Sequence, residues 1–277
     1  AWPCVKEQVE SGDIQWNKEF IIDLYDSISD SCNVSFPTYM RDAFNCPIEY
    51  GKIIAGGREI VAERGLFITK KRYAALIFDL EGYRTDRDSP GKLKAMGLDL
   101  KRSDTPKAMQ VFLEELLLEV LKGAKEDKAL EMIRDFRFKF ASAPSWLKGS
   151  PKRVNKLTFY GDALKRKGKV TMPGHVRAAI NWNNLRKMNG DRYSMEIQDG
   201  FKVIVCKLKP NPMNMTSIAY PVDELQLPEW FKEMPFDDDT MEKTIVDQKV
   251  RNLLGVMDWK LDDAVENNNF GSLFDFN

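Results

Sequence analysis

The amino-acid sequence predicts an α+β fold. Segments rich in β-branched residues follow one another between residues 52 and 80, and apolar residues recur at helical spacing between residues 105 and 143, patterns that are typical of strands and of helices respectively. With 277 residues, 43% of them hydrophobic, the chain is long enough to bury a sizeable core in one large domain or two smaller ones.

The first third of the chain is expected to contain one helix followed by two or three strands. Every fourth residue from Trp16 to Ile28 is large and apolar, which predicts an amphipathic helix over residues 16–31. The proline-containing segment 32–37 is expected to end this helix. The expected strands are residues 52–56, 58–69 and 72–80, joined by glycine turns at residues 56–57 and at Gly65.

The remainder of the chain is expected to be mainly helical. Thr105 and Pro106 can serve as N-cap and first residue of a helix that continues to Gly123. The other expected elements are a helix over residues 127–143, a strand over 202–208 and a helix from about 238 to 254. The last twelve residues, 266–277, have the composition of a polar, flexible linker with an apolar end.

Composition excludes several classes of protein. No run approaches the roughly 18 consecutive apolar residues of a membrane helix, and the N-terminus lacks the apolar core of a signal peptide, so we expect a soluble, cytoplasmic protein with no membrane partner. The four cysteines form no C-x-x-C pair, and we expect them to be reduced. A single histidine, His175, excludes mechanisms that need two.

The charges are unevenly distributed although they sum to zero. The 42 basic and 42 acidic residues cancel, which by itself argues against a nucleic-acid partner. However, residues 148–177 contain 9 basic and 1 acidic side chains, whereas residues 222–277 contain 5 basic and 14 acidic ones. A basic run is usually a solvated face, but further cations between Lys70 and Lys107 alternate with hydroxyl-bearing residues that also bind phosphate.

Four motifs follow one another between residues 66 and 107. They are Lys-Lys-Arg-Tyr at 70–73, Asp-Leu-Glu-Gly at 79–82, Lys-Leu-Lys-Ala-Met-Gly at 92–97 and Thr-Pro at 105–106. In order and spacing this stretch resembles the end of the palm and the start of the thumb of family B DNA polymerases of the T-even bacteriophage type. Weaker similarities to the same family lie at 58–62, 173–177 and 272–276.

The resemblance implies a division into three parts. Residues 1–98 would be the C-terminal part of the palm, a partial domain of strands and a helix. Residues 99–265 would form a mainly helical thumb with a small β element, and residues 266–277 a flexible tail that binds the sliding clamp.

The chemistry of this family needs two metal ions held by carboxylates, and the motifs that carry these carboxylates are missing. Neither D-x-x-S-L-Y-P nor Y-G-D-T-D-S occurs, nor does the fingers pattern K-x-x-x-N-S-x-Y-G. The segment Tyr160-Gly161-Asp162 is interpreted as a turn, and the acids at 79 and 81 are assigned no metal. Glu59 resembles an acid that lies near the metal site without binding the metal.

We therefore expect no catalytic residue, metal site or cofactor in this chain alone, and no polymerase activity without a partner. Mg²⁺ would belong to the assembled polymerase, whose N-terminal chain would carry the exonuclease, the fingers and the catalytic palm. The sequence does not distinguish a naturally split polymerase from a truncated fragment. The host would be an infected bacterial cell.

The resemblance also assigns binding residues. Lys71 would reach the minor groove beside the primer terminus, where every correct base pair presents an acceptor, and Tyr73 would support the primer backbone. The expected primer-template contacts are Lys70, Lys71, Arg72, Tyr73, Lys101, Arg102, Ser103, Thr105 and Lys107, of which Thr105 can equally be only a helix cap. The expected contacts to the duplex backbone are Lys152, Arg153, Lys165, Lys167, His175 and Arg177, although a lone histidine more often has a structural role.

Two further surfaces are expected to bind protein. Leu273, Phe274 and Phe276 are apolar residues on a polar terminus and would dock into a hydrophobic pocket of the clamp, unless they pack back on their own domain. An orphaned palm would expose an apolar face, which predicts self-association in isolation. The alternative function is a stand-alone DNA-binding or clamp-binding accessory protein without polymerase activity.

Overall fold

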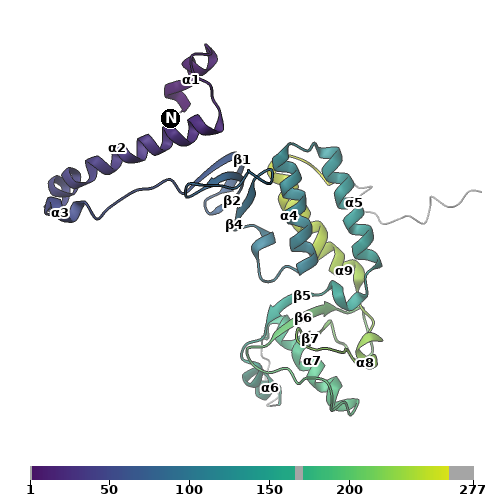
Figure 1. Ribbon diagram of the computed structural model, residues 1–277. Coiled ribbons are helices and arrows are strands. Elements are labelled where there is room, and N and C mark those ends of the chain that lie inside the picture. The colour runs from purple at the N-terminus through teal and green to yellow at the C-terminus, as the bar shows by residue number, and fades with distance from the viewer. Residues whose placement is uncertain (1, 166–170, 262–277) are drawn as a thin grey trace, which may run out of the picture. The chain divides into compact units, whose positions relative to one another are not determined.

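The computed structural model in Figure 1 describes residues 2–165 and 171–261. The chain divides into two compact units, and each is described by itself. The first unit consists of Ala1–Gly65 and Ala75–Lys94, and the second of Leu66–Ala74 and Ala95–Asn277. The described residues form helices and two small antiparallel sheets, which confirms the α+β class. The assignment of a palm and a thumb stays a prediction.

The first unit combines a helical arm with a small sheet. The arm contains α1 (Trp2–Glu10), α2 (Lys18–Phe44) and α3 (Ile48–Gly51), and the sheet contains β1 (Ile60–Thr69), β2 (Arg72–Leu80), β3 (Tyr83–Arg84) and β4 (Lys92–Met96). The strand order is β1-β2-β3, and β4 pairs with β2. The tip of the β1–β2 hairpin, residues 66–74, belongs to the second unit.

Helix α2 is longer than the sequence predicts, because Pro37 lies inside it instead of ending it. A proline within a helix loses one backbone hydrogen bond, but the helix resumes and closes at Asn45. This residue adopts the left-handed conformation, and its N–H donates to the carbonyl of Met40, a regular C-terminal cap. The other end is capped by Asn17, whose side chain accepts from the N–H of Phe20 at 2.9 Å.

The predicted strand over 52–56 and the predicted turn at Gly65 are both wrong. Residues 52–56 contain no strand. At the end of this segment, the backbone of Gly56 is bound by the side chain of Asn33 instead of by a neighbouring strand. The Asn33 amide donates to the carbonyl of Gly56 at 2.9 Å, and its oxygen accepts from the N–H of Gly56 at 2.7 Å. Gly65 lies within β1, and the turn is formed instead by Lys70 and Lys71.

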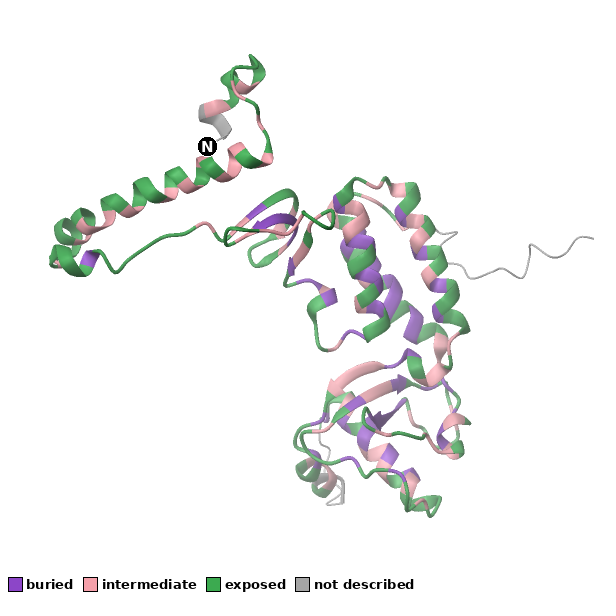
Figure 2. Ribbon diagram, in the orientation of Figure 1, coloured by how far each residue is buried: buried purple, intermediate pink, exposed green. Residues whose placement is uncertain are grey.

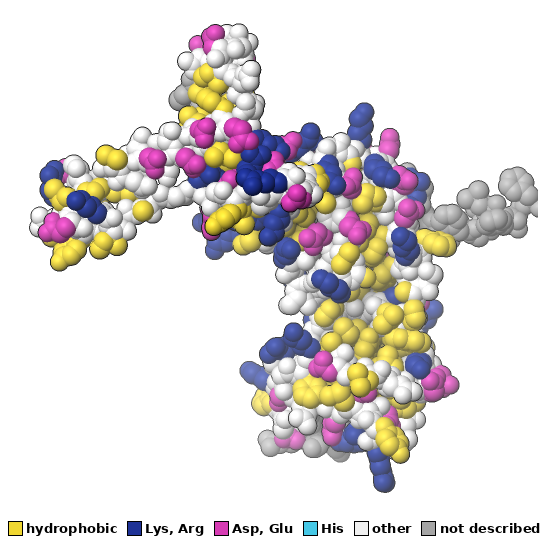
Figure 3. Space-filling view, in the orientation of Figure 1, with side chains coloured by type: hydrophobic (Ala, Val, Ile, Leu, Met, Phe, Trp, Pro, Cys, Tyr) yellow, Lys and Arg dark blue, Asp and Glu magenta, His cyan; other side chains and the backbone are white. Residues whose placement is uncertain are grey.

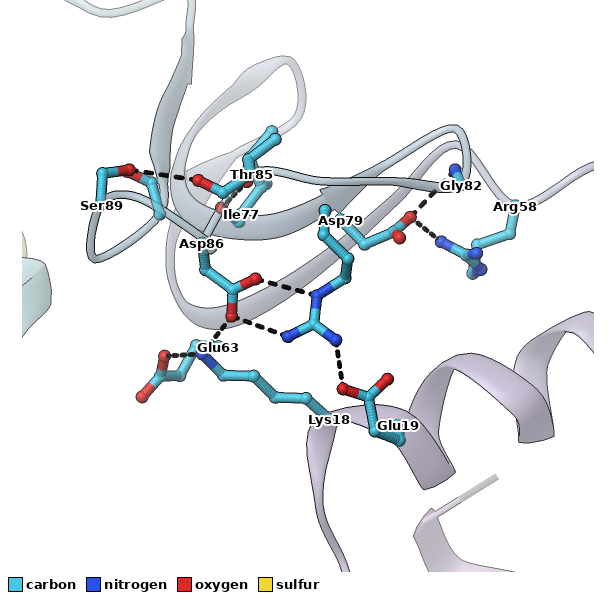
Figure 4. A network of polar contacts seen from close by, with 12 residues as sticks. Lys18, Glu19, Arg58, Glu63, Ile77, Asp79, Gly82, Thr85, Asp86 and Ser89 are labelled. Carbon is cyan, nitrogen blue, oxygen red and sulfur yellow. Dashed lines mark hydrogen bonds and ion pairs between the residues drawn. The ribbon is translucent and has the colours of Figure 1, made fainter.

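A polar network joins the start of α2 to the sheet (Figure 4). Lys18 lies 2.8 Å from Asp86 and 3.1 Å from Glu63, and Arg84 donates to Asp86 at 2.8 Å and also pairs with Glu19. The hydrogen bond from Arg84 holds the pKa of Asp86 well below its usual range. The network anchors the N-terminal end of α2 to the edge of the sheet.

The second unit contains a group of helices and a three-stranded sheet. Its helices are α4 (Lys107–Lys122), α5 (Glu126–Ser142), α6 (Leu157–Lys165), α7 (Gly174–Met188), α8 (Glu229–Lys232), α9 (Asp238–Glu242) and α10 (Gln248–Leu254), and its strands are β5 (Ser150–Arg153), β6 (Lys202–Lys207) and β7 (Ser217–Pro221). Short helical turns are η1 (Asp99–Lys101), η2 (Ser145–Lys148), η3 (Lys243–Asp247, π-helical) and η4 (Gly255–Met257). Four predictions are confirmed here: the helices near 105–123 and 127–143, the strand near 202–208 and the helix near 238–254.

The sheet is antiparallel, in the order β5-β6-β7, and α7 packs against it. An aromatic cluster forms the core beside the sheet. Trp182 of α7 and Phe231 of α8 are fully buried, and the ring centroid of Phe231 lies 5.2 Å from that of Trp182 and 5.3 Å from that of Tyr220. Figure 2 shows the buried residues of this unit as purple stretches along α4, α7 and the sheet.

The helices of the second unit enclose a buried ion-pair network. Arg137 of α5 is 4% exposed, and it lies 3.0 Å from Glu242, directly before the π-helical turn η3, and 3.2 Å from Asp247, the last residue of η3. Burial raises the pKa of Asp247, while the positive charge of Arg137 opposes this shift. Nearby, Phe112 of α4 stacks on Phe136 of α5 at a centroid distance of 4.1 Å.

Two local predictions for the second unit are corrected. Tyr160-Gly161-Asp162 is not a turn but the middle of α6, a helix whose first N–H, that of Leu157, donates to the carboxylate of Asp199 at 2.5 Å. The capping residue lies 42 positions away in the sequence, so the residues next to the helix do not include the N-cap that would predict where it begins. Helix α4 begins at Lys107, one residue later than predicted, with Pro106 before it and Gly123 as its left-handed C-cap.

No helix among the described residues is long and apolar enough to cross a membrane.

Candidate nucleic-acid interface

The hairpin tip presents two lysines at its turn. Lys70 and Lys71 are exposed and form the turn between β1 and β2. Lys71 has a φ of 64°, a left-handed conformation that suits a tight turn. Tyr73 is half-buried, just before the buried residues 74–79 of β2, and its ring stacks on Phe67 at a centroid distance of 5.9 Å.

The tip is held against the start of η1 through Gly97. Arg72 donates from Nε to the carbonyl of Gly97 at 3.2 Å. Gly97 has a φ of 64°, and a Cβ at this position would collide with the carbonyl oxygen of Lys71. Only glycine fits this close approach without strain. The turn lysines are therefore placed beside η1, which ends in Lys101.

Asp104 joins two basic segments that lie far apart in the sequence. It accepts from Arg102 at 3.0 Å and lies 3.0 Å from Nζ of Lys152 on β5. The two cations, Arg102 first, hold the pKa of Asp104 well below its usual range. The structure thus brings the segment 101–107 together with the start of the basic stretch 148–177.

Thr105 is buried, in contrast to its expected place at a phosphate. It is 1% exposed, and its hydroxyl accepts from Nζ of Lys249 at 2.9 Å. Lys249, on α10, also lies 3.5 Å from Asp99. In this structure Thr105 ties α10 to the start of α4. Lys249 was not predicted from the sequence, because the position of a lysine in an amphipathic helix does not indicate which distant residues it contacts.

The basic stretch 148–177 separates into internal and surface positions. Lys148 is 3% exposed, donates to the carbonyl of Ala141 at 2.8 Å and pairs with Asp238 at 3.0 Å, so its charge is used inside the fold. Arg153 and Arg177 are exposed. Lys167 and the side chain of Lys165 lie outside the described residues.

His175 lies in the first turn of α7 and is half-buried. Burial lowers its pKa, and the positive charge of Lys152 adds to this effect. At neutral pH the ring is therefore uncharged, and it would meet DNA as a neutral hydrogen-bonding group.

Several exposed cations of the second unit remain unneutralised. Among the described residues, none of the following takes part in an ion pair: Lys70, Lys71, Lys101, Lys107, Arg153 and Arg177. We refer to these six residues as the basic cluster. Figure 3 shows dark-blue Lys and Arg side chains gathered on the β5 side of the sheet. Ser103 is exposed beside the cluster, in the loop before α4.

Glu59 is exposed just before β1 and pairs with Lys94 of β4. Within residues 2–165 and 171–261, no group of three or more His, Cys, Asp or Glu side chains could hold a metal ion. Asp79 is buried and accepts from the N–H of Gly82 at 3.1 Å and from Arg58, so it stabilises the turn after β2. The clamp residues Leu273, Phe274 and Phe276 lie outside the described residues.

Two known proteins match this chain over much of its length, although no family model matches it. The DNA-directed DNA polymerase of Enterobacteria phage T4 is 29% identical over 182 residues, which is 65% of this chain and 18% of the phage protein. That of Escherichia phage RB69 is 32% identical over 158 residues, which is 57% of this chain and 17% of the phage protein.

The chain spans less than a fifth of the length of these two relatives. The matches confirm the resemblance that the motifs between residues 66 and 107 predict. The matched part of the chain is therefore similar to a region of the DNA polymerases of these two T-even-type phages.

Proposed function

We propose that the chain is the C-terminal part of a family B DNA polymerase that grips primer-template DNA and binds the sliding clamp. A separate N-terminal polymerase chain supplies the exonuclease, the fingers and the catalytic carboxylates with their Mg²⁺. Two observations support this division: the chain corresponds to 17–18% of the relatives' length, and the carboxylate motifs of the family are missing from its sequence.

The basic cluster is the observation that carries the DNA-binding role. Its members come from the β1–β2 turn, from η1 and the start of α4, and from β5 and α7, and all belong to one compact unit. Exposed cations without a carboxylate partner are free to neutralise phosphates, which supplies most of the affinity of a sequence-independent DNA grip. Lys70, Lys71, Lys101 and Lys107 would then contact the primer-template junction. Arg153 and Arg177 would contact the backbone of the duplex behind it.

The first experiment measures how binding of a primer-template duplex depends on salt. Fluorescence anisotropy compares the wild-type chain with Lys101→Ala/Lys107→Ala, which removes two members of the basic cluster. Each lost phosphate contact lowers the slope of log K against log salt by about 0.9, so we expect a slope smaller by about 2. The matched control, Lys6→Ala/Lys52→Ala, removes the same charge from exposed positions of the first unit and is expected to leave the slope unchanged. Equal slopes in the two variants would overturn the assignment.

The second experiment tests the division of labour. The chain is mixed with the same-source polymerase chain that carries the D-x-x-S-L-Y-P and Y-G-D-T-D-S motifs, and primer extension is measured with Mg²⁺. We expect extension only in the mixture. DNA binding without any association of the two chains would instead identify a stand-alone accessory protein.

The clamp contact is tested by removing residues 272–277. We expect this deletion to abolish binding to the sliding clamp, because it removes Leu273, Phe274 and Phe276, and to leave the affinity for primer-template DNA intact. Loss of both activities would show that the tail contributes to the fold and is not a dedicated clamp contact.

A further inference from the structure

The helical arm of the first unit leaves its apolar side chains uncovered. None of the 27 residues of α2 is buried, and Figure 2 shows the helix as exposed and intermediate along its whole length. The exposed large hydrophobic residues of the arm and of the segment that follows it are Tyr25, Ile28, Val34, Tyr39, Phe44, Ile48, Tyr50, Ile53 and Ile54. Most helical stability in proteins comes from packing an apolar face against other residues. A helix of this length with no buried residue therefore lacks the surface against which its apolar face would pack.

This exposure is concentrated in one region. Among the described residues, 9 of the 22 exposed large hydrophobic side chains lie between residues 25 and 54. Val34 is 82% and Ile53 77% exposed. Single exposed apolar residues are ordinary, whereas a gathering of them marks an interaction surface. Figure 3 shows yellow hydrophobic side chains along this arm with magenta carboxylates among them.

A groove lies between the first half of α2 and the sheet. Its apolar lining consists of Trp16, Ile21, Tyr25, Ile60, Val61 and Phe78. A second groove runs along α2 past Leu24, Ile28 and Cys32. Both belong to the first unit.

The groove walls are held by ion pairs, so the surface is formed before a partner arrives. Arg58 donates to Asp26 of α2 at 2.7 Å and also pairs with Asp79 of β2. Lys18 joins the start of α2 to Asp86 at 2.8 Å. A preformed apolar groove loses little conformational entropy on binding.

We propose that the N-terminal polymerase chain docks on this arm, in the groove between α2 and the sheet and along the exposed face of α2. This inference rests on the proposed function. The aligned residues cover less than a fifth of the two relatives, and the proposed function assigns the catalytic part of such a polymerase to the N-terminal chain. In the proposed function the carboxylates of that chain act at the primer end, which the tip of the β1–β2 hairpin would hold. Strands β1 and β2 continue from this tip into the sheet that lines the groove, so a chain that reaches the tip is well placed to contact this sheet.

A second copy of the chain is a poorer occupant. Helix α2 carries five acidic side chains. Three of them are paired with arginines, and among the described residues Asp23 and Asp30 take part in no ion pair. Packing two copies of this helix together would place carboxylates against carboxylates, and like charges at an interface are costly. The expected partner surface is therefore apolar with a basic rim. Interfaces between permanently associated chains are more hydrophobic than transient ones. The many exposed apolar residues of the arm fit a permanent interface.

The experiment compares two substitutions at exposed positions. Ile28→Asp places a charge on the face of α2, where the side chain is 41% exposed, and the matched control Phe138→Asp places one on α5 of the second unit, where it is 69% exposed. Binding to the same-source chain that carries the carboxylate motifs is measured by isothermal titration calorimetry. We expect Ile28→Asp to weaken binding about 10-fold or more, as for a central interface residue, and Phe138→Asp to have no effect. Circular dichroism and primer-template affinity, both expected to be unchanged, report on folding.

The outcomes separate this inference from the proposed function. If the wild-type chains associate and extend primers while folded Ile28→Asp binds as tightly as wild type, the docking surface is wrong and the proposed function stands. If the wild-type chains neither associate nor extend primers, both are overturned. A homodimer that Ile28→Asp dissociates, without binding to the other chain, would identify a second copy as the occupant and overturn the inference.

Discussion

The two units of the molecule differ in what they leave at the surface. In the second unit, six of the 16 residues of α4 are buried, and the aromatic rings around Trp182 complete a core. In the first unit, none of the 27 residues of α2 is buried. Both helices have apolar residues at helical spacing. Amphipathic periodicity therefore predicts which residues are able to form a core, but not whether the chain itself provides the other half of it.

The charges do not separate the two units in the same way. In the first unit Arg58, Arg84 and Lys94 pair with carboxylates, but Arg64, Arg87 and Lys92 are exposed and, among the described residues, take part in no ion pair. In the second unit Lys148 and Lys152 are paired, whereas the basic cluster, within the described part of the chain, is not. The uncovered helix of the first unit therefore supports a protein partner, and the basic cluster of the second supports a polyanion.

The largest expected effect is a loss of stability in the second unit, which tests whether its core is more closely packed than that of the first unit. Trp182→Ala removes a fully buried ring and is expected to lower the free energy of unfolding by about 3–5 kcal/mol, the usual cost of such a cavity. Val34→Ala in α2, at a side chain that is 82% exposed, is expected to change it by less than about 0.5 kcal/mol. Urea unfolding followed by circular dichroism measures both. Similar losses would show that the two units pack equally well.

The buried network of the second unit is expected to be nearly as sensitive. Arg137→Met leaves the carboxylates of Glu242 and Asp247 buried without their cation, which costs about 3 kcal/mol or more. Replacing the two carboxylates as well, in Arg137→Met/Glu242→Met/Asp247→Leu, is expected to restore most of the loss, because no uncompensated charge remains. Urea unfolding of the two variants decides this, and a triple variant as unstable as the single one would contradict it.

The attachment of the hairpin tip is tested at a glycine. Gly97→Ala places a Cβ against the carbonyl of Lys71 at a φ of 64°, and we expect a loss of about 2 kcal/mol together with weaker DNA binding. The matched control is Gly82→Ala, because Gly82 also has a positive φ, 87°, but no atom within 4 Å of the added Cβ. Its cost is the backbone strain of about 1 kcal/mol alone. Equal losses and equal DNA affinities would show that the tip does not depend on Gly97.

The smallest effect concerns pH. Because burial lowers the pKa of His175 from its usual 6.5, the unfolded chain binds a proton more readily than the folded chain just below pH 6.5. Its contribution to stability is therefore present above pH 6.5 and is lost as the pH falls toward the folded pKa. His175→Gln is expected to remove this part of the acid destabilisation, measured as the change in unfolding free energy between pH 7.5 and 5.5. A variant with the same pH dependence as wild type would show that His175 does not contribute.

Local patterns were sufficient for much of the second unit and for the resemblance to phage polymerases. The helices near 105–123 and 127–143 and the strand near 202–208 were predictable because their periodicity and glycine signals lie within the elements themselves. The errors arose where distant residues decided the outcome. Asn33 binds the backbone of Gly56 and replaces a strand partner, and Asp199 caps α6 from 42 residues away.

The candidate interface shows the same limit. The sequence identified cations at 101–107 and 148–177, but their meeting at Asp104, the burial of Lys148 and of Thr105, and the contact of Lys249 with Thr105 depend on the tertiary structure. Whether a lysine faces solvent or a buried carboxylate is a property of the packed chain. No spacing along the sequence distinguishes Lys148 from Arg153.

By itself the sequence determined the type of each side chain, its spacing and the order of motifs, and these were enough to indicate the family and most regular elements, because they depend on neighbours along the chain. The tertiary structure alone decided which charges are neutralised and which apolar faces are covered. The physical reason is that ion pairing and burial act between atoms that are close in space, and residues such as Asp104 and Lys152 become neighbours only when the chain folds.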